Sequence, residues 1–386
     1  MKRKPHILLV FFRIWRAWIS PMATLGGFRS ILVLLFQVLS AAAAGSFWSV
    51  KYLPGFSGPL PFELETGYVG VGDSEEVQVF YYFVKSQGNP QTDPLMTWLI
   101  GGPGCSALSG FAVEIGPVNF KIEPYNGSTP QLILNPHSWT KKASILFIDM
   151  PVGTGFSYAR TPQGLKKGDL VQVQQNHQFL RKWLTDHPEF IPNPFYVGGD
   201  SYSGIIIPPL TQAISEGNKH LFPAINLQEY KYYLSYYWAN DDQVRKALHI
   251  REGTVEEWFR CESKKDYQFD ITNVLPYHVN LSSKDYRSLI FSGDHDMMVP
   301  ILDTEAWIKS LNYSIVDEWR PWFDDEDQVL GYTRTFANNM TFATIKGGGH
   351  TPQTMQYQTS IMFNRWIARK SFIKILKNYV IQFISC

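Results

Sequence analysis

The chain has 386 residues, of which 45% are hydrophobic and 18% charged, and this composition supplies a large core and excludes a mainly disordered chain. Its 35 Lys and Arg residues nearly balance 34 Asp and Glu residues, so no overall field attracts nucleic acid and we expect no nucleic-acid partner. The length allows two or three domains, but we expect one large α/β domain.

The N-terminal region predicts export. Residues 31–39 have the sequence ILVLLFQVL, with Arg29 before them and four successive alanines shortly after them. A basic start, a short apolar run and small residues are typical of a cleaved signal peptide, whereas a membrane anchor needs about 20 apolar residues. We therefore expect residues 1–44 to be an N-terminal extension and signal peptide, cleaved near Ala44, which leaves no membrane anchor. Met22 is an alternative start that would give the signal peptide an ordinary length.

Export would place the mature chain in the secretory pathway, as a secreted or vacuolar protein. Glycosylation sequons are expected on such a chain, and each one alone is a weak signal. Four are present, at Asn126, Asn280, Asn312 and Asn339.

The three cysteines are Cys105, Cys261 and Cys386. They are too few for a disulfide scaffold, and they lack the spacing of zinc ligands. At most one bridge can form among them, and the count leaves the pairing open. We expect no metal site and no cofactor.

Short apolar runs recur along the rest of the chain and predict buried strands. Most of them end at Gly, Asp or Pro, and stretches with a helical pattern lie between some of them, at 171–185 and 241–250. Such a mixture predicts an α/β fold, in which helices cover the faces of a sheet. The predicted strands are residues 77–84, 95–100, 144–148, 195–197, 288–291 and 341–345.

A glycine-rich turn follows the strand predicted at 95–100. Its sequence, GGPGCS at 101–106, allows backbone N–H groups to approach a ligand closely, and no Gly-Lys-Ser/Thr of a phosphate-binding loop follows it. A tetrahedral intermediate needs two such donors for its oxyanion, and loss of one costs about 3 to 4 kcal/mol of barrier stabilisation. Our candidate donors are the amides of Gly102 and Tyr202.

A turn of small residues follows the strand predicted at 195–197. Ser201 has Gly199 two positions before it and Ser203 two positions after it, which permits the strained strand-to-helix turn of a nucleophile elbow. Ser203 lacks this context, because Ser201 and Ile205 flank it. The motif differs from G-x-S-x-G at one position, and a serine in an ordinary loop is the alternative interpretation.

A serine nucleophile needs a histidine base that a carboxylate holds in place. In α/β-hydrolases these residues follow one another along the chain as Ser, Asp and His. Asp296 and His350 satisfy this order, and both lie just beyond predicted strands. Asp294 and His295 are the alternatives. The spacing from the preceding glycine and the following Val-Pro favour Asp296, and a run of three glycines favours His350, because it lets the imidazole approach the nucleophile.

Five motifs together resemble the serine carboxypeptidase-like proteins of plants, a branch of the α/β-hydrolases. The resemblance implies an α/β-hydrolase fold with a mostly parallel central sheet, and the same triad of Ser201, Asp296 and His350. It covers roughly residues 47–228 and 230–366. The motifs are GGPGCS at 101–106, DMPVGTGFSY at 149–158, GDSYSG at 199–204, GDHD at 293–296 and GGGH at 347–350.

The same resemblance implies a disulfide between Cys105 and Cys261, with Cys386 unpaired. It also implies an acyl-enzyme formed with a peptide or an acyl-ester substrate.

Carboxypeptidases of this family hold the terminal carboxylate of the substrate at three positions, which here are Ile100, Glu114 and Asp200. Ile100 stands where the family has asparagine and cannot donate a hydrogen bond, a loss of about 1 to 3 kcal/mol. Asp200 is one methylene shorter than the family's glutamate. These replacements resemble the acyltransferase branch, which moves an acyl group from a glucose ester to an alcohol. Release of C-terminal residues from peptides is our first hypothesis, and acyl transfer is the second.

Two segments depart from the family pattern. After Gln228, where the family continues with a sheet strand and a helical lid, residues 229–240 resemble a segment well beyond the lid. We therefore expect an internal deletion near 228–229 that removes one strand and the lid from an α/β-hydrolase domain at 45–366. A divergent tail is expected at 367–386. The third hypothesis is a non-catalytic, truncated splice product.

Overall fold

The computed structural model describes residues 47–216, 231–262, 264 and 266–370. The expected signal peptide, the junction at 228–229 and the tail from 371 onward, which includes Cys386, lie outside the described residues. Within the described ranges, no helix is both long and apolar enough to cross a membrane.

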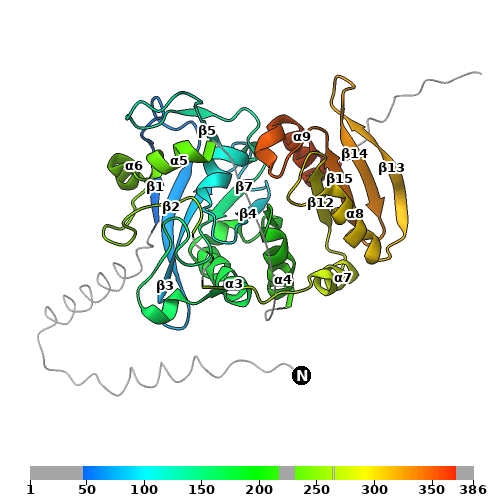
Figure 1. Ribbon diagram of the computed structural model, residues 1–386, viewed down its shortest axis with the longest axis horizontal. Helices are drawn as coiled ribbons and strands as arrows, with labels where there is room; N and C mark the ends of the chain where they lie inside the picture. Colours follow the sequence, from blue (N-terminus) through cyan, green and yellow to red (C-terminus); the bar gives the residue numbers. More distant parts are fainter. Residues whose placement is uncertain (1–46, 217–230, 263, 265, 371–386) are drawn as a thin grey trace, which may run out of the picture. The chain divides into compact units, whose positions relative to one another are not determined.

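A seven-stranded sheet forms the larger part of the fold (Figure 1). Its strands lie in the order β1-β2-β3-β7-β4-β10, and β8 pairs with β3 beside this path. The pairs β1-β2, β2-β3 and β3-β7 are antiparallel, whereas the pairs β7-β4 and β4-β10 are parallel. The bounds are β1 (Phe47–Val50), β2 (Leu64–Val71), β3 (Val77–Val84), β4 (Leu95–Leu99), β7 (Ser144–Ile148), β8 (Tyr158–Ala159) and β10 (Phe195–Gly199).

Alternating side chains of β3 build a hydrophobic core on each face of this sheet. Phe80 and Tyr82 belong to one cluster and Tyr81 and Phe83 to the other, because successive side chains of a strand point to opposite faces. Helices α3 (Asp169–Asp186) and α4 (Ser203–Glu216) cover the second face, and α5 (Lys231–Ala239) covers the first. Burial of each aromatic side chain contributes about 1.5 to 3 kcal/mol.

A four-stranded sheet carries the C-terminal part of the described chain. Its order is β12-β15-β14-β13, in which β12 and β15 are parallel and the other pairs are antiparallel. The bounds are β12 (Ser288–Gly293), β13 (Ile315–Phe323), β14 (Val329–Phe336), β15 (Met340–Ile345), α7 (Leu275–Ser283), α8 (Ile301–Ser310) and α9 (Gln356–Ile367).

Shorter elements connect these sheets and helices. They are η1 (Gly110–Glu114), β5 (Val118–Phe120), β6 (Leu132–Leu134), η2 (Trp139–Lys141), η3 (Pro162–Leu165), β9 (Lys167–Gly168), η4 (Pro188–Phe190), α6 (Asp242–Ala247), β11 (Tyr267–Gln268) and η5 (Pro352–Met355).

The sequence-based expectation of an α/β fold is confirmed. All six predicted strands and both predicted helices are present, with ends that shift by a few residues. The sequence analysis did not anticipate β1, β2, β13 and β14. The expected parallel pairing holds for the inner strands, and the antiparallel pairing of the outer strands makes the sheets mixed.

Two strands in the middle of the fold have a neighbour on one side only among the described residues. They are β10, which pairs with β4, and β12, which pairs with β15. All five residues of β10 are half-buried, whereas β4 and β7 are fully buried. Trp366 connects these two edges, since its ring lies 5.4 Å from that of Tyr196 in β10 and 4.5 Å from the guanidinium of Arg287 before β12.

Candidate active site

Ser201 lies on the sharp turn between β10 and α4, with a backbone φ of +52°. A non-glycine residue in this region is strained, and such strain is typical of a nucleophile elbow. The turn can form because Gly199 has no side chain: a Cβ there would lie 2.3 Å from the Leu99 carbonyl oxygen and from the Ser203 hydroxyl.

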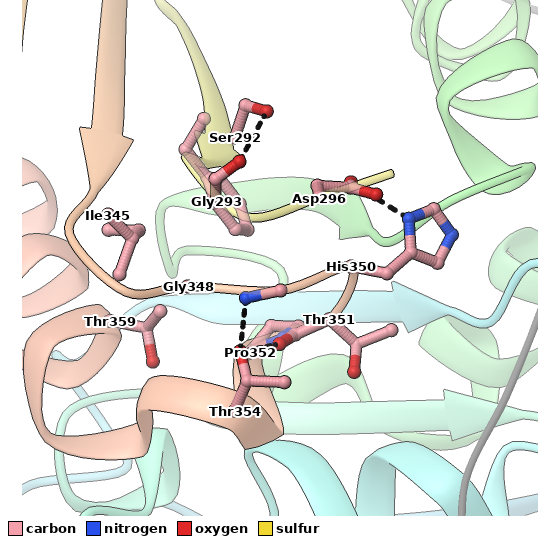
Figure 2. A pocket seen from close by; sticks show the side chains of 12 residues that line it. Ser292, Gly293, Asp296, Ile345, Gly348, His350, Thr351, Pro352, Thr354 and Thr359 are labelled. Carbon is pink, nitrogen blue, oxygen red and sulfur yellow. Dashed lines mark hydrogen bonds and ion pairs between the residues drawn. The ribbon is translucent and has the colours of Figure 1, made fainter. Parts of the chain in front are cut away.

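His350 joins Ser201 to Asp296 through its two ring nitrogens. Nε2 lies 2.8 Å from the Ser201 hydroxyl oxygen, and Nδ1 lies 2.9 Å from a carboxylate oxygen of Asp296. Asp296 and His350 follow β12 and β15, and Figure 2 shows the two side chains pointing toward each other. The structure therefore brings together the three residues that the sequence analysis singled out.

The carboxylate of Asp296 is held in its charged form. Burial opposes ionisation, but the hydrogen bond with His350 and those from the amides of Val299 and Met298 outweigh it, so its pKa lies below the ordinary value. A charged, fixed carboxylate suits a group that orients an imidazole and stabilises it when it gains a proton.

The alternatives named in the sequence analysis have other roles. Ser203 is buried and donates its hydroxyl to the Asp200 carbonyl, and Asp294 accepts a hydrogen bond from the Gly347 amide. The side chain of His295 is 76% exposed.

The glycine-rich turn packs directly against the nucleophile. A Cβ on Gly101 would lie 2.6 Å from the Cβ of Ser201 and 2.7 Å from the amide nitrogen of Tyr202, so only glycine fits there. Buried Asp149 anchors the end of this turn, because its carboxylate accepts hydrogen bonds from the Ser106 hydroxyl and the Ala107 amide.

The predicted disulfide between Cys105 and Cys261 is confirmed. It ties the glycine-rich turn to a segment 156 residues later in the chain.

A buried pair of acids, Glu114 and Asp200, lies next to this turn. Asp200 accepts a hydrogen bond from the Gly101 amide, and Glu114 accepts from Trp98 and from the Tyr232 hydroxyl. Burial raises the pKa of both carboxyl groups, and the charge of Asp200 raises that of Glu114 further. Ile100 is buried in the core and offers an apolar side chain.

Two residues near these acids were not found from the sequence. The guanidinium of Arg260 lies 3.3 Å from the ring centre of Tyr232, and its positive charge opposes the pKa rise of Glu114 and Asp200. The only sequence feature that could have pointed to Arg260 is its position next to Cys261. No sequence feature points to Tyr232, because only tertiary contacts bring it next to Glu114.

Asp296 and His350 also line a small cavity of about 30 Å³, and Figure 2 shows the side chains around it. Its lining includes Ser292, Thr351 and Thr354. A cavity of that volume holds no more than a few water molecules, so it is too small for a peptide substrate. Among the described residues, no cluster of three or more His, Cys, Asp or Glu side chains could hold a metal ion.

The fold and the arrangement of Ser201, Asp296 and His350, on turns and loops that follow β10, β12 and β15, define an α/β-hydrolase. The family model described as serine carboxypeptidase matches residues 54–231 and 227–369, and the chain belongs to this family.

Relatives from Arabidopsis thaliana are similar over most of their length. Serine carboxypeptidase-like 7 is 46% identical over 426 residues, covering 88% of this chain and 96% of the relative. Serine carboxypeptidase-like 2 is 45% identical, covering 88% of this chain and 97% of the relative. The solved structure of Kex1(Δ)p, a prohormone-processing carboxypeptidase from Saccharomyces cerevisiae, has a TM-score of 0.73 at 18% identity and covers 86% of this chain and 97% of that one. At that identity the likeness shows the fold alone.

The alignment with serine carboxypeptidase-like 7 is longer than the aligned part of this chain. It spans 426 positions, but 88% of 386 residues is about 340, so about 86 aligned positions have no counterpart here. The two family matches meet at residues 227–231, which include the expected junction at 228–229.

Replacement of Asp296 by Asn should reduce the rate at which a fluorophosphonate labels Ser201 by at least about 100-fold, because the imidazole loses its orienting charge. The measurement is the second-order labelling rate at fixed pH. Asp294→Asn is the matched control, two residues away, and should label within about threefold of the wild type. Equal losses in both variants would contradict the assignment of Asp296.

Proposed function

We propose that this chain is a serine-type carboxypeptidase that acts through an acyl-enzyme. Ser201 attacks the carbonyl carbon next to the C-terminal residue, and His350 accepts the hydroxyl proton at Nε2 and returns it to the leaving amine. Asp296 keeps the imidazole oriented. Water then attacks the acyl-enzyme and releases the shortened peptide. The observation that carries this proposal is the continuous hydrogen-bond chain from Ser201 through His350 to Asp296.

The amides of Gly102 and Tyr202 would stabilise the oxyanion. This assignment is supported by the close packing of the glycine-rich turn on the nucleophile. Glu114 and Asp200 would bind the terminal carboxylate of the peptide. Two acids can bind an anion when at least one is protonated, and their raised pKa values favour that state in acidic solution.

A second candidate is acyl transfer from a glucose ester to an alcohol, through the same acyl-enzyme. The observation that favours it is Ile100, whose buried apolar side chain cannot donate a hydrogen bond to a carboxylate. A third candidate is a non-catalytic product, which the unpaired sides of β10 and β12 among the described residues favour.

Product analysis separates these candidates. The protein is incubated with an N-blocked dipeptide and, separately, with an acyl-glucose plus an alcohol, and Ser201→Ala is the control in each reaction. We expect a free C-terminal amino acid from the dipeptide. An acylated alcohol without dipeptide cleavage would favour the transferase, and failure of a folded, monomeric sample to react in either assay or with a fluorophosphonate would favour the non-catalytic product.

The acid pair predicts a pH dependence of peptide binding. Because burial raises the pKa of Asp200 to about 6, this carboxyl group is neutral below that pH, and above it the Asp200 carboxylate repels the terminal carboxylate of the peptide. We expect KM for a peptide with a free C-terminus to rise by about tenfold between pH 5 and pH 7.5. An N-blocked amino-acid methyl ester is the control, since it has no terminal carboxylate. The same KM profile for both substrates would contradict this role of Glu114 and Asp200.

We also propose export with N-glycosylation, supported by the exposure of Asn126, Asn312 and Asn339, while Asn280 is half-buried. The chain expressed in plant cells should lose mass on treatment with an N-glycosidase. An unchanged mass would contradict glycosylation of these sequons.

A further inference from the structure

Another buried carboxylate near the nucleophile, that of Asp169, has no part in the proposed reaction. Asp169 is the first residue of α3 and is fully buried. One of its oxygens accepts hydrogen bonds from the hydroxyl groups of Tyr202 and Tyr267, both at 2.6 Å. The other accepts from the backbone amide of Asp270, at 2.9 Å. The carboxylate is therefore fully engaged by donors that come from distant parts of the chain.

These hydrogen bonds connect three segments of the chain: the nucleophile turn, the start of α3 and the region of β11. Tyr202 directly follows Ser201, and Tyr267 lies in β11, which pairs with β9 immediately before Asp169. β11 begins six residues after Cys261, whose disulfide holds the glycine-rich turn. Asp169 therefore connects the start of α3, the nucleophile turn and β11. The chain just before β11 carries Cys261, which is bonded to the glycine-rich turn on the other side of Ser201.

The nucleophile turn needs such an anchor for a physical reason. Ser201 has a positive φ, and a strained conformation persists only where its surroundings over-determine it. Tyr202 is 2% exposed, so its side chain is enclosed and cannot take another hydrogen-bond partner from solvent. A hydroxyl donor to a charged acceptor makes a strong, short hydrogen bond. A shift of the Tyr202 ring would move its backbone amide and Ser201 together.

We propose that Asp169 is a positioning residue that holds the nucleophile turn in its reactive geometry through the side chain of Tyr202. This inference rests on the proposed function, because it assumes that Ser201 is the nucleophile. Asp169 lies outside the triad, on a helix that carries no triad residue. By holding Tyr202 it would fix the directions of both the Ser201 hydroxyl and the Tyr202 amide.

The chain offers a matched pair of variants for the test. Tyr202→Phe and Tyr267→Phe each remove one hydroxyl that donates at 2.6 Å to the same oxygen of Asp169, and both tyrosines are buried. Only Tyr202 is adjacent to Ser201. The Tyr267 hydroxyl also lies 3.0 Å from Oε1 of Gln172. If Asp169 only stabilised the fold, the labelling rate of each variant would fall in proportion to its loss of stability, whereas a positioning role lowers the labelling rate in Tyr202→Phe beyond its loss of stability.

The readouts are fluorophosphonate labelling of the full chain and unfolding by denaturant. We expect Tyr202→Phe to lower the maximal labelling rate by at least about tenfold without changing the concentration for half-maximal rate, since small displacements of a nucleophile are costly. Tyr267→Phe should label within about twofold of the wild type, although it lowers the denaturation midpoint similarly. Asp169→Asn combined with Tyr202→Phe should label no more slowly than Asp169→Asn alone.

Wild-type labelling in Tyr202→Phe, or equal losses in the two phenylalanine variants, would overturn the inference and leave the proposed function intact. A wild-type chain that is folded but does not label would overturn both, because the turn would then hold no nucleophile. The phenylalanine variants keep the Asp169 carboxylate and the ring packing, so the comparison stands even where Asp169→Asn does not fold.

Discussion

The hydrogen bond between His350 Nε2 and the Ser201 hydroxyl is the contact on which the rest of the site depends, because it joins two separate sheets. Ser201 follows a strand of the seven-stranded sheet, whereas Asp296 and His350 follow strands of the four-stranded sheet. Among the described strands, none pairs across from β10 to β12. The alignment of the triad is therefore maintained by side-chain packing and not by a continuous ladder of backbone hydrogen bonds.

Helix α9 makes several of the contacts that hold the two sheets together. The ring of Phe363 stacks on Trp139 at 4.1 Å, and the Gln356 side chain donates to the carbonyls of Val113 and Glu114. Further along the helix, Trp366 contacts Tyr196 and accepts a hydrogen bond from Arg287 at its carbonyl. Since α9 begins a few residues after His350, these contacts also fix the loop that carries the imidazole.

The buried charges around the nucleophile divide into two groups with different physical settings. Asp149 and Asp169 are satisfied by hydroxyl and amide donors, and both anchor turns that form the walls of the site. Asp200 lies close enough to Glu114 that its charge raises the pKa of Glu114, and the positive charge of Arg260 opposes that effect. A carboxylate surrounded by donors is fixed, whereas the repulsion between two buried acids favours a protonated form, in which a carboxyl group can donate a hydrogen bond.

The amino-acid sequence by itself determined the class of fold, the elbow around Ser201 and the order of the triad residues, because small residues at set distances encode tight turns locally. The tertiary structure decided what depends on distant contacts. It placed Tyr232 and Arg260 beside Glu114, and it brought Asp169 into contact with Tyr202 next to the nucleophile. The choice of Asp296 over Asp294 was already favoured by the sequence, and the structure adds the contact with the imidazole. Asp169 and Tyr267 lie 98 positions apart in the chain, so no local pattern of residues predicts their hydrogen bond.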